Sequence, residues 1–126
     1  MQNVIYVGVD IVEIWRVREV FERYPVRFLE KVYTPDERAY CRGRAPQLAS
    51  RFAAKEAAMK ALGTGVRGVA WKEVEVQRAR GKAPEIMLHG RAKARAYHMG
   101  ITRLALSLSH SRDYAVASVV GEAGDG

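Results

Sequence analysis

A short helical stretch in the middle of the chain carries charged side chains at a spacing that suits catalysis. Residues 52–65 read FAAKEAAMKALGTG, in which Glu56 and Lys60 interrupt an Ala-rich run. Because residues four apart project from one face of a helix, a carboxylate and an ammonium lie side by side there. Such a pair is either catalytic or an ordinary surface ion pair worth about 0.3–0.5 kcal/mol. The helix alone does not decide between these interpretations.

Polar groups near the two ends of the chain are also candidates for chemistry. Asp10 follows the apolar run Val4 to Val9, which is typical of a short buried strand, and a strand end is a natural place for a functional carboxylate. The same position would equally suit an N-cap of the next helix. His110 lies at the tip of a hairpin predicted over residues 104–120, where a lone histidine is more often solvated than catalytic.

Periodic patterns predict the elements that must position these groups. Apolar residues at helical spacing predict a helix from Ile11 to Tyr24, which Pro25 ends. The segment Thr34-Pro35-Asp36-Glu37 is typical of a helix start, with an N-cap hydroxyl and a glutamate three residues later. Further patterns predict a helix from Pro46 to Leu62 stopped by Gly63, strands at 74–76 and 86–88, and a helix at 91–99.

These elements predict a single α+β domain in which a mainly antiparallel sheet packs against the long central helix. With 126 residues, the chain has the usual size of one domain, which commonly has roughly 100–150 residues. We expect this domain to span residues 1–121, with a flexible tail at residues 122–126.

Composition limits the partners and the location. The formal charge of +7, from 21 basic and 14 acidic residues, favours acidic proteins, nucleic acids or polyphosphates as partners. No apolar stretch approaches a membrane span, and the N-terminus lacks the basic start of a secretory signal, so we expect a cytoplasmic protein with no membrane partner. The single cysteine, Cys41, cannot form an internal disulfide and is interpreted as structural.

Three segments that occur in order along the chain carry a resemblance to a known family. They are Gly8-Val9-Asp10-Ile11-Val12-Glu13-Ile14, the Glu56 to Lys60 helix and Ser107-Leu108-Ser109-His110. Together they resemble the holo-acyl-carrier-protein synthase family, the small 4'-phosphopantetheinyl transferases. That family often has Gly-Ile-Gly before its aspartate, whereas this chain has Tyr6-Val7-Gly8-Val9 and lacks the first glycine.

The resemblance implies an activity in fatty acid biosynthesis. Enzymes of this family transfer 4'-phosphopantetheine from coenzyme A to a serine of apo acyl carrier protein and release adenosine 3',5'-bisphosphate. Attack on the pyrophosphate of coenzyme A requires its negative charge to be neutralised as the leaving group departs. A divalent cation does this, and Mg²⁺ usually takes only one or two carboxylates. The resemblance also implies a homotrimer with active sites between adjacent subunits, and no nucleic acid as a partner.

The resemblance assigns roles to residues of this sequence. Asp10 and Glu56 are the implied Mg²⁺ ligands, while Glu56 and Lys60 are the implied catalytic residues. The carrier serine gives its proton either to Glu56 directly or to Glu56 through a water molecule. The implied coenzyme A contacts are Arg42, Arg44, Arg51, Lys60, Gly63, Thr64, Gly65, His110 and Ser111. Arg16 and Arg27 match basic positions that receive the acidic carrier protein.

Two interpretations from other classes of protein remain open. A small RNA-binding protein would explain the charge, although the chain has no aromatic stacking motif of the Lys/Arg-Gly-Phe type. A noncatalytic module that binds acidic proteins would explain the arginines without using Asp10, Glu56 or Lys60. Salt-dependent RNA retention without coenzyme A binding would favour the first, and carrier binding without chemistry would favour the second.

Overall fold

The computed structural model describes residues 3–79 and 81–124. Its strands are β1 (Val4–Glu13), β2 (Val74–Gln77), β3 (Glu85–Leu88), β4 (Ile101–His110) and β5 (Tyr114–Ala123). Its helices are α1 (Ile14–Arg23), α2 (Pro25–Val32), α3 (Pro35–Cys41), α4 (Ala45–Leu62), α5 (Gly65–Gly68), the 3₁₀ helix η1 (Trp71–Glu73) and α6 (Gly90–His98). The expected α+β architecture is confirmed.

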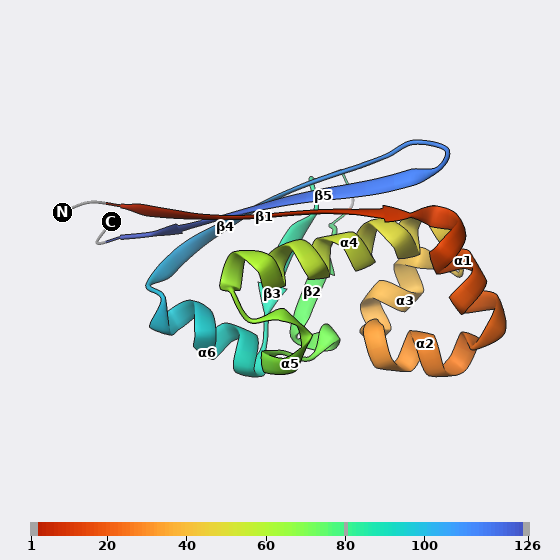
Figure 1. The fold of residues 1–126 in the computed structure, drawn as a ribbon, viewed down its shortest axis with the longest axis horizontal. Coiled ribbons are helices and arrows are strands. Elements are labelled where there is room, and N and C mark those ends of the chain that lie inside the picture. The colour runs from red at the N-terminus through yellow and green to blue at the C-terminus, as the bar shows by residue number, and fades with distance from the viewer. Residues whose placement is uncertain (1–2, 80, 125–126) are drawn as a thin grey trace.

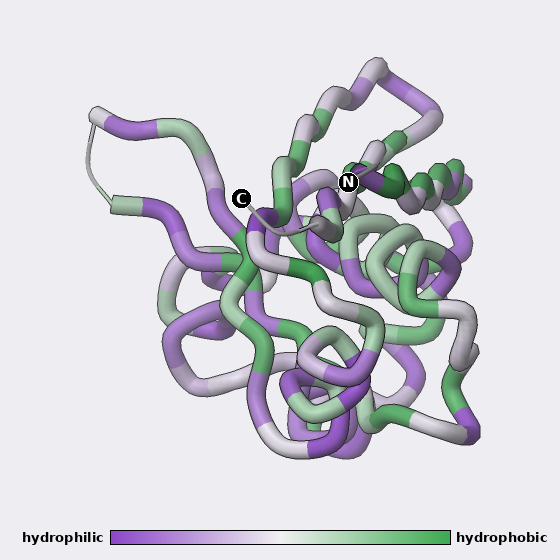
Figure 2. The backbone as a smooth tube through the Cα atoms, turned by 90° about the vertical axis from the view of Figure 1, so that its left-hand side faces the viewer, coloured by the Kyte–Doolittle hydropathy of each residue, from purple (hydrophilic) through white to green (hydrophobic). Residues whose placement is uncertain are grey.

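The strands form two antiparallel sheets. The larger sheet has the order β1-β5-β4, with β5 in the centre, and the smaller one is the β2–β3 hairpin. All helices lie on one side of the larger sheet, where α4 runs beneath β1 and β5 (Figure 1). In Figure 2 the two hairpins project as separate arms, and hydrophilic residues occupy the turn between β4 and β5. Within the described ranges, no helix covers the opposite face of the sheet.

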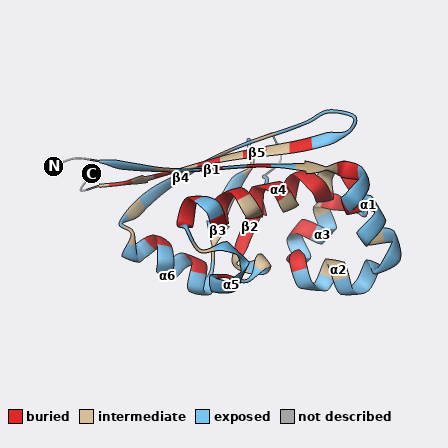
Figure 3. Ribbon diagram, viewed as in Figure 1, coloured by how far each residue is buried: buried red, intermediate tan, exposed pale blue. Residues whose placement is uncertain are grey.

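Small residues let α4 lie directly against β1. The buried side of α4 includes Ala53, Ala54, Ala57 and Ala61, which pack in the main hydrophobic core (Figure 3). On β1 the facing residue is Gly8, where a Cβ atom would collide with the backbone carbonyl of Ala57. A glycine is therefore needed at this position because strand backbone and helix backbone meet there.

Several local signals in the sequence are confirmed. Thr34 caps α3 in a reciprocal capping box, in which Glu37 N donates to Thr34 Oγ1 over 3.2 Å and Thr34 N donates to Glu37 Oε1 over 2.9 Å. α4 has a proline in its first turn and ends at Gly63, whose φ of 71° is the left-handed conformation typical of a glycine C-cap.

The prediction for residues 10 to 32 is wrong in two respects. β1 continues through Asp10 to Glu13 because it pairs with β5 along its whole length, so Asp10 faces Ala117 in the ladder and does not cap a helix. The first helix accordingly begins at Ile14 and not at Ile11. Pro25 does end α1, but it also occupies the first turn of α2, a helix that the sequence analysis did not anticipate.

The C-terminal strand reaches further than expected. Glu122 and Ala123, which the sequence analysis assigned to the tail, pair with Ile5 and Val4 as the last residues of β5. Residues 125 and 126 of the predicted tail lie outside the described residues. β5 is therefore paired on both sides up to its last residue, because Ala123 also pairs with Ile101 of β4.

Cys41 is fully buried at the end of α3. Burial raises the pKa of its thiol to about 11, although the neighbouring Arg51 opposes this effect. The thiol therefore stays neutral at physiological pH, which agrees with a structural role.

We predict that Gly8→Ala destabilises the fold, because the added methyl group must push β1 away from α4. The free energy of unfolding should fall by about 3 kcal/mol, the upper range for overpacking a core, as measured by urea denaturation. Gly121→Ala on β5 is the matched control, since its Cβ would meet only the side chains of Ile101 and Leu104. Equal losses for the two variants would contradict the prediction.

Candidate functional site

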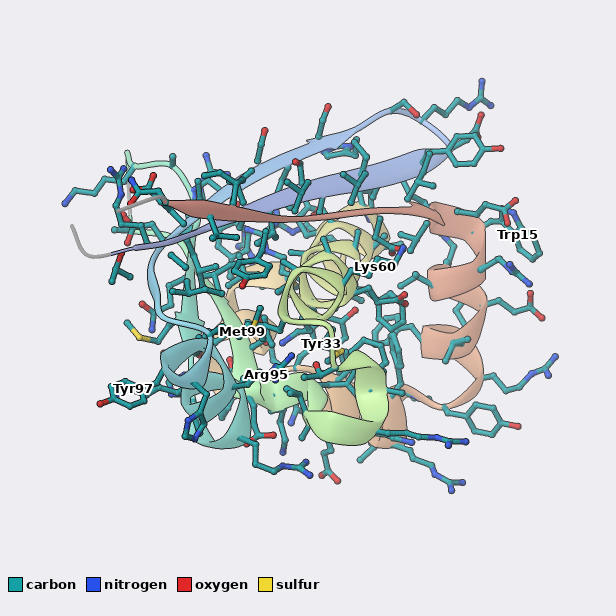
Figure 4. All side chains as sticks on the ribbon, turned by 60° about the vertical axis from the view of Figure 1, so that its left-hand side comes forward. Trp15, Tyr33, Lys60, Arg95, Tyr97 and Met99 are labelled. Carbon is teal, nitrogen blue, oxygen red and sulfur yellow. The ribbon has the colours of Figure 1, made fainter. Side chains whose placement is uncertain are left out.

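The candidate site begins where β1 meets α4. The Asp10 side chain is 10% exposed, and Lys60 Nζ donates to its Oδ1 over 3.0 Å. The same ammonium donates to the backbone oxygen of Val9 over 3.0 Å. Lys60 thus reaches from α4 to β1 (Figure 4), while Asp10 Oδ2 is buried with no hydrogen-bond partner within the described part of the chain.

Glu56 lies one helical turn before Lys60, where the charges of Asp10 and Lys60 both influence its pKa. Its pKa is raised because it is half-buried and because the negative charge of Asp10 is close, while Lys60 opposes the shift. Two carboxylates therefore share one ammonium, so the cluster carries a net negative charge when both are ionised. A cation bound beside Asp10 and Glu56 would relieve that repulsion.

The donor set suits Mg²⁺ better than a metal that needs an all-protein cage. In residues 3–79 and 81–124 there is no group of three or more His, Cys, Asp or Glu side chains that could hold a metal ion. Mg²⁺ commonly takes one or two carboxylates and completes its shell with substrate phosphates and water. Asp10, with its unpartnered buried oxygen, and Glu56 fit that pattern.

The predicted pairing on α4 changes in one respect. Glu56 and Lys60 do lie close enough for Lys60 to influence the pKa of Glu56, as their spacing predicts. The ion pair of Lys60, however, is made with Asp10 on another element. Lys60 is therefore part of a tertiary cluster, which distinguishes it from an ordinary surface residue of the helix.

A pocket of about 570 Å³ opens beside Glu56. Its walls come from β1, α1, α2, α4 and Tyr114 of β5, and most of them are apolar. The lining residues other than Glu56 and Tyr114 are Ile11, Val12, Glu13, Arg16, Val17, Val20, Phe28 and Phe52. A substrate group that approaches Glu56 would thus meet an apolar cavity with two charged residues, Glu13 and Arg16, at the start of α1.

A second, basic pocket lies between α3, α4 and the two hairpins. It consists of two adjoining cavities of about 360 and 350 Å³ that share Tyr40, Arg51 and Arg78. The Arg51 guanidinium lies 4.2 Å from the centre of the Tyr40 ring, and Arg78 Nη1 donates to the Tyr40 hydroxyl over 3.3 Å. Lys82 lines one cavity together with the carboxylates Asp36 and Glu85, and His110 lines the other, so basic residues outnumber acidic ones. This pocket suits a phosphorylated ligand.

Arg42 and Arg44, the remaining predicted basic contacts, lie outside the basic pocket in different surroundings. Arg44 donates through Nε to Cys41 O and through Nη2 to Tyr40 O, so its guanidinium caps the end of α3. Arg42 is exposed and adopts a left-handed φ of 48° at the same helix end. The structure therefore brings Arg51 and His110 into one pocket but does not place Arg42 or Arg44 among the lining residues of that pocket.

The β4–β5 turn positions His110 and Ser111, two of the predicted coenzyme A contacts. His110 is the last residue of β4 and pairs with Ala115, so it stands just before the turn and not at its tip. Ser111 Oγ accepts from the backbone N–H groups of Asp113 and Tyr114 over 3.3 and 3.2 Å. The hydroxyl of Ser111 therefore holds the turn together.

The Gly63 to Gly65 segment forms the exit of α4. Gly65 starts the short helix α5. Arg95 of α6 donates through Nε to Leu62 O over 2.9 Å, which ties the last turn of α4 to α6. Thr64 Oγ1 is buried and has no partner among the residues that the structure describes. This end of α4 therefore carries one buried hydroxyl whose hydrogen-bonding capacity is unused among the described residues.

The two predicted carrier contacts lie on neighbouring helices. Arg16 on α1 pairs with Glu13 over 3.5 Å and lies over the Trp15 ring, which points away from the body of the protein (Figure 4). Arg27 is exposed on α2. Arg16 itself lines the Glu56 pocket, and Arg27 directly precedes Phe28, which lines the same pocket.

Three residues of importance were missed in the sequence. Tyr40 and Arg78 organise the basic pocket, and Lys55 is completely buried beside Glu37. The run Arg78-Ala79-Arg80-Gly81-Lys82 is a visible basic cluster in a hairpin loop and could have indicated the second arginine site. Nothing in the sequence indicates that Lys55 is buried.

The geometry defines a class of protein: a mixed helix and sheet domain with a cluster of Asp10, Glu56 and Lys60 and a separate pocket that Arg51, Arg78 and His110 line. Comparison with known proteins gives the family. The model of the 4'-phosphopantetheinyl transferase superfamily matches residues 6–119, and this chain belongs to that superfamily. The resemblance seen in the sequence is thereby confirmed.

Individual relatives cover nearly the whole chain. The chain is 49% identical over 119 residues to a holo-[acyl-carrier-protein] synthase of Koribacter versatilis. This match covers 91% of this chain and 95% of the relative. A holo-[acyl-carrier-protein] synthase of Caldanaerobacter subterraneus is 40% identical over 124 residues, and the match covers 96% of this chain and 97% of that relative. The crystal structure of the Helicobacter pylori holo-[acyl-carrier-protein] synthase in complex with coenzyme A is 32% identical with a TM-score of 0.83, and covers 91% of this chain and 98% of that one.

One further observation concerns the surroundings of the protein. Among residues 3–79 and 81–124, none of the helices combines the length and hydrophobicity of a membrane span.

Proposed function

We propose that this chain is a holo-[acyl-carrier-protein] synthase, which transfers 4'-phosphopantetheine from coenzyme A to a serine of apo acyl carrier protein. The serine oxygen forms a bond to the phosphorus that carries pantetheine, and the bond from that phosphorus to the bridging oxygen breaks. Adenosine 3',5'-bisphosphate leaves with the electron pair. The observation that carries this proposal is the Asp10–Lys60 cluster beside Glu56 in a chain of this family.

Asp10 and Glu56 would hold a Mg²⁺ ion in this reaction. When bound, the ion supplies neutralising charge for the pyrophosphate of coenzyme A. Asp10 brings a buried oxygen that no group in the described part of the chain satisfies, and Glu56 brings a carboxylate whose raised pKa reflects burial and the charge of Asp10. The Glu56 carboxylate is also the group that would accept the proton of the serine hydroxyl, directly or through a water molecule.

Lys60 and the basic pocket would hold the phosphates. Lys60 already neutralises one oxygen of Asp10 and is half-exposed, so it can move its ammonium toward a phosphate oxygen of the leaving group. Arg51 and His110 line the basic pocket, where Arg51 is held rigid by Tyr40. We assign this pocket to the nucleotide phosphates of coenzyme A.

The carrier protein would approach along α1 and α2. Arg16 and Arg27 present positive charge on the side where the Glu56 pocket opens, and an acidic partner would be steered to that side. Surface charges of this kind act mainly on the association rate, so carrier binding should weaken as salt increases. The cytoplasmic location, expected from the composition, and the role in fatty acid biosynthesis, implied by the family resemblance, stay predictions.

A homotrimer would complete the site. Within one chain, the acidic cluster lies at β1 and α4, while Arg51 and His110 line a different pocket. On the helix-free face of the large sheet, β1 exposes the apolar side chains of Ile5, Val7, Val9 and Ile11 by 52–62%. An association of copies through this face would cover these side chains and bring the basic pocket of one subunit to the acidic cluster of another.

The proposed function is tested by mixing the chain with apo acyl carrier protein, coenzyme A and Mg²⁺, then weighing the carrier by mass spectrometry. We expect a carrier that gains one phosphopantetheine group. A folded protein that leaves a competent carrier unmodified would refute the proposal. Retention of RNA without binding of coenzyme A would support a nucleic-acid-binding protein, and carrier binding without modification would support a noncatalytic module.

We predict that Glu56→Gln lowers kcat by about 100-fold or more, the range for losing a group that stabilises charge in the transition state. The fold should be unchanged, because Glu56 lies at a pocket wall outside the core. The control is Glu30→Gln, an exposed residue of α2. A near-normal rate for Glu56→Gln at saturating Mg²⁺ would count against a role as metal ligand.

The homotrimer predicts a mass in solution of three times the 14.1 kDa of one chain, measured by light scattering. Val7→Glu combined with Val9→Glu should give a folded monomer with little activity, because buried charge would repel the copies. Val66→Glu, at an exposed residue of α5, should leave the trimer intact. An active monomeric wild-type protein would exclude this assembly.

A further inference from the structure

Lys55 occupies an unusual place for a charged residue. It directly precedes Glu56 on α4, and its side chain and that of Glu37 are both fully buried. Its ammonium donates to Glu37 Oε1 over 2.7 Å, to Val74 O over 2.6 Å and to Trp71 O over 3.1 Å. All three hydrogens of the ammonium therefore have acceptors, and these acceptors belong to three different elements.

Glu37 extends this connection to further backbone groups. Its Oε1 also accepts from Thr34 N, and its Oε2 accepts from Val76 N over 2.8 Å. The ion pair consequently joins α4 to α3, to η1 and to β2. From Val76, strand β2 leads directly into the basic pocket, which Val76 and Gln77 line. One buried pair thus links the helix of the acidic cluster to a wall of the basic pocket.

Packing alone does not account for this pair. Two buried charges lose their hydration, and well-packed apolar residues of similar volume commonly replace such a pair without loss of stability. Burial lowers the pKa of Lys55, against the attraction of Glu37, which shows that the charged form is opposed by its surroundings.

Helix geometry gives the pair a consequence for the site. Consecutive residues of an α-helix point about 100° apart, so the direction of Lys55 determines the direction of Glu56. The three acceptors hold Lys55 toward η1 and β2, and Glu56 is therefore turned toward Asp10 and its pocket. A small rotation of α4 would move the Glu56 carboxylate away from Asp10.

We propose that Lys55 is a positioning residue of the active site, which acts through Glu37, Trp71 and Val74 to fix the rotation of α4 and so to aim Glu56 at Asp10. This inference rests on the proposed function, because it concerns the same acidic cluster. Lys55 itself touches no substrate in this arrangement, since it is enclosed by protein. Its removal should affect catalysis and cation binding more than it affects binding of the nucleotide.

The first test is Lys55→Met, which keeps the length of the side chain and removes the charge. We expect kcat to fall by about 100-fold, as misplacement of reacting groups commonly costs, while KM for coenzyme A changes by less than about threefold. The matched control is Met59→Ala on the same helix, a buried core residue outside the ion pair. The control should lower the melting temperature but keep kcat within about threefold of the wild type.

The second readout does not depend on activity. Mn²⁺ is titrated into each variant with coenzyme A bound and no carrier present, and free Mn²⁺ is followed by electron paramagnetic resonance. Lys55→Met should bind Mn²⁺ about tenfold or more weakly, as loss of an orienting partner commonly causes, whereas Met59→Ala should match the wild type. Unchanged kcat and unchanged Mn²⁺ binding in folded Lys55→Met would overturn the proposal.

A double variant separates positioning from stability. Lys55→Met leaves Glu37 as an unpaired buried charge. The second substitution, Glu37→Gln, removes that charge and keeps an acceptor for Val76 N. We expect the double variant to melt at a higher temperature than Lys55→Met and still to show the low kcat and the weak Mn²⁺ binding.

The outcomes of the double variant are decisive. Recovery of kcat to the wild-type value, or failure of the double variant to fold, would assign the pair to stability and overturn the proposal. Failure of the wild-type protein to modify the carrier would instead refute the proposed function, so the two failures are distinguishable.

Discussion

The close contact between α4 and β1 is the constraint on which the rest of the structure depends. At Gly8 no side chain separates the strand from the helix, and Ala57 of α4 presents only its backbone and a methyl group. Asp10 lies two residues further along β1, so it points to the same side of the sheet as Gly8. The short Asp10 side chain can therefore meet Lys60, one turn beyond Ala57.

The same helix distributes its charged residues among separate tasks. Lys55 points into the core and pairs with Glu37, Glu56 and Lys60 face β1, and Arg51 faces Tyr40 and the basic pocket. The 100° step of the helix turns residue 56 about 100° from residue 55 and about 140° from residue 51, whereas residues 51 and 55 lie on one side of the helix, one turn apart. The Ala residues between them fill the contacts with the sheet and leave room for each charged group.

The sequence predicts those features that depend on local chemistry. The capping box of Thr34, the glycine stop at Gly63 and both hairpins are set by neighbouring residues, and all were identifiable. Features that depend on distant partners were not. The apolar residues of 11–14 suit a helix, but pairing with β5 extends β1 through them. The acceptors of the buried Lys55 likewise come from other elements, at Glu37, Trp71 and Val74.

The pattern of β1 also bears on the completeness of a single chain. A strand at the edge of a sheet with one solvated face should alternate apolar and polar residues, whereas β1 is apolar on both faces from Val4 to Val9. Its inner face packs on α4, but Ile5, Val7 and Val9 on its outer face are about half-exposed. Such a pattern is typical of a strand covered on both sides, which supports the proposed association of copies through this face.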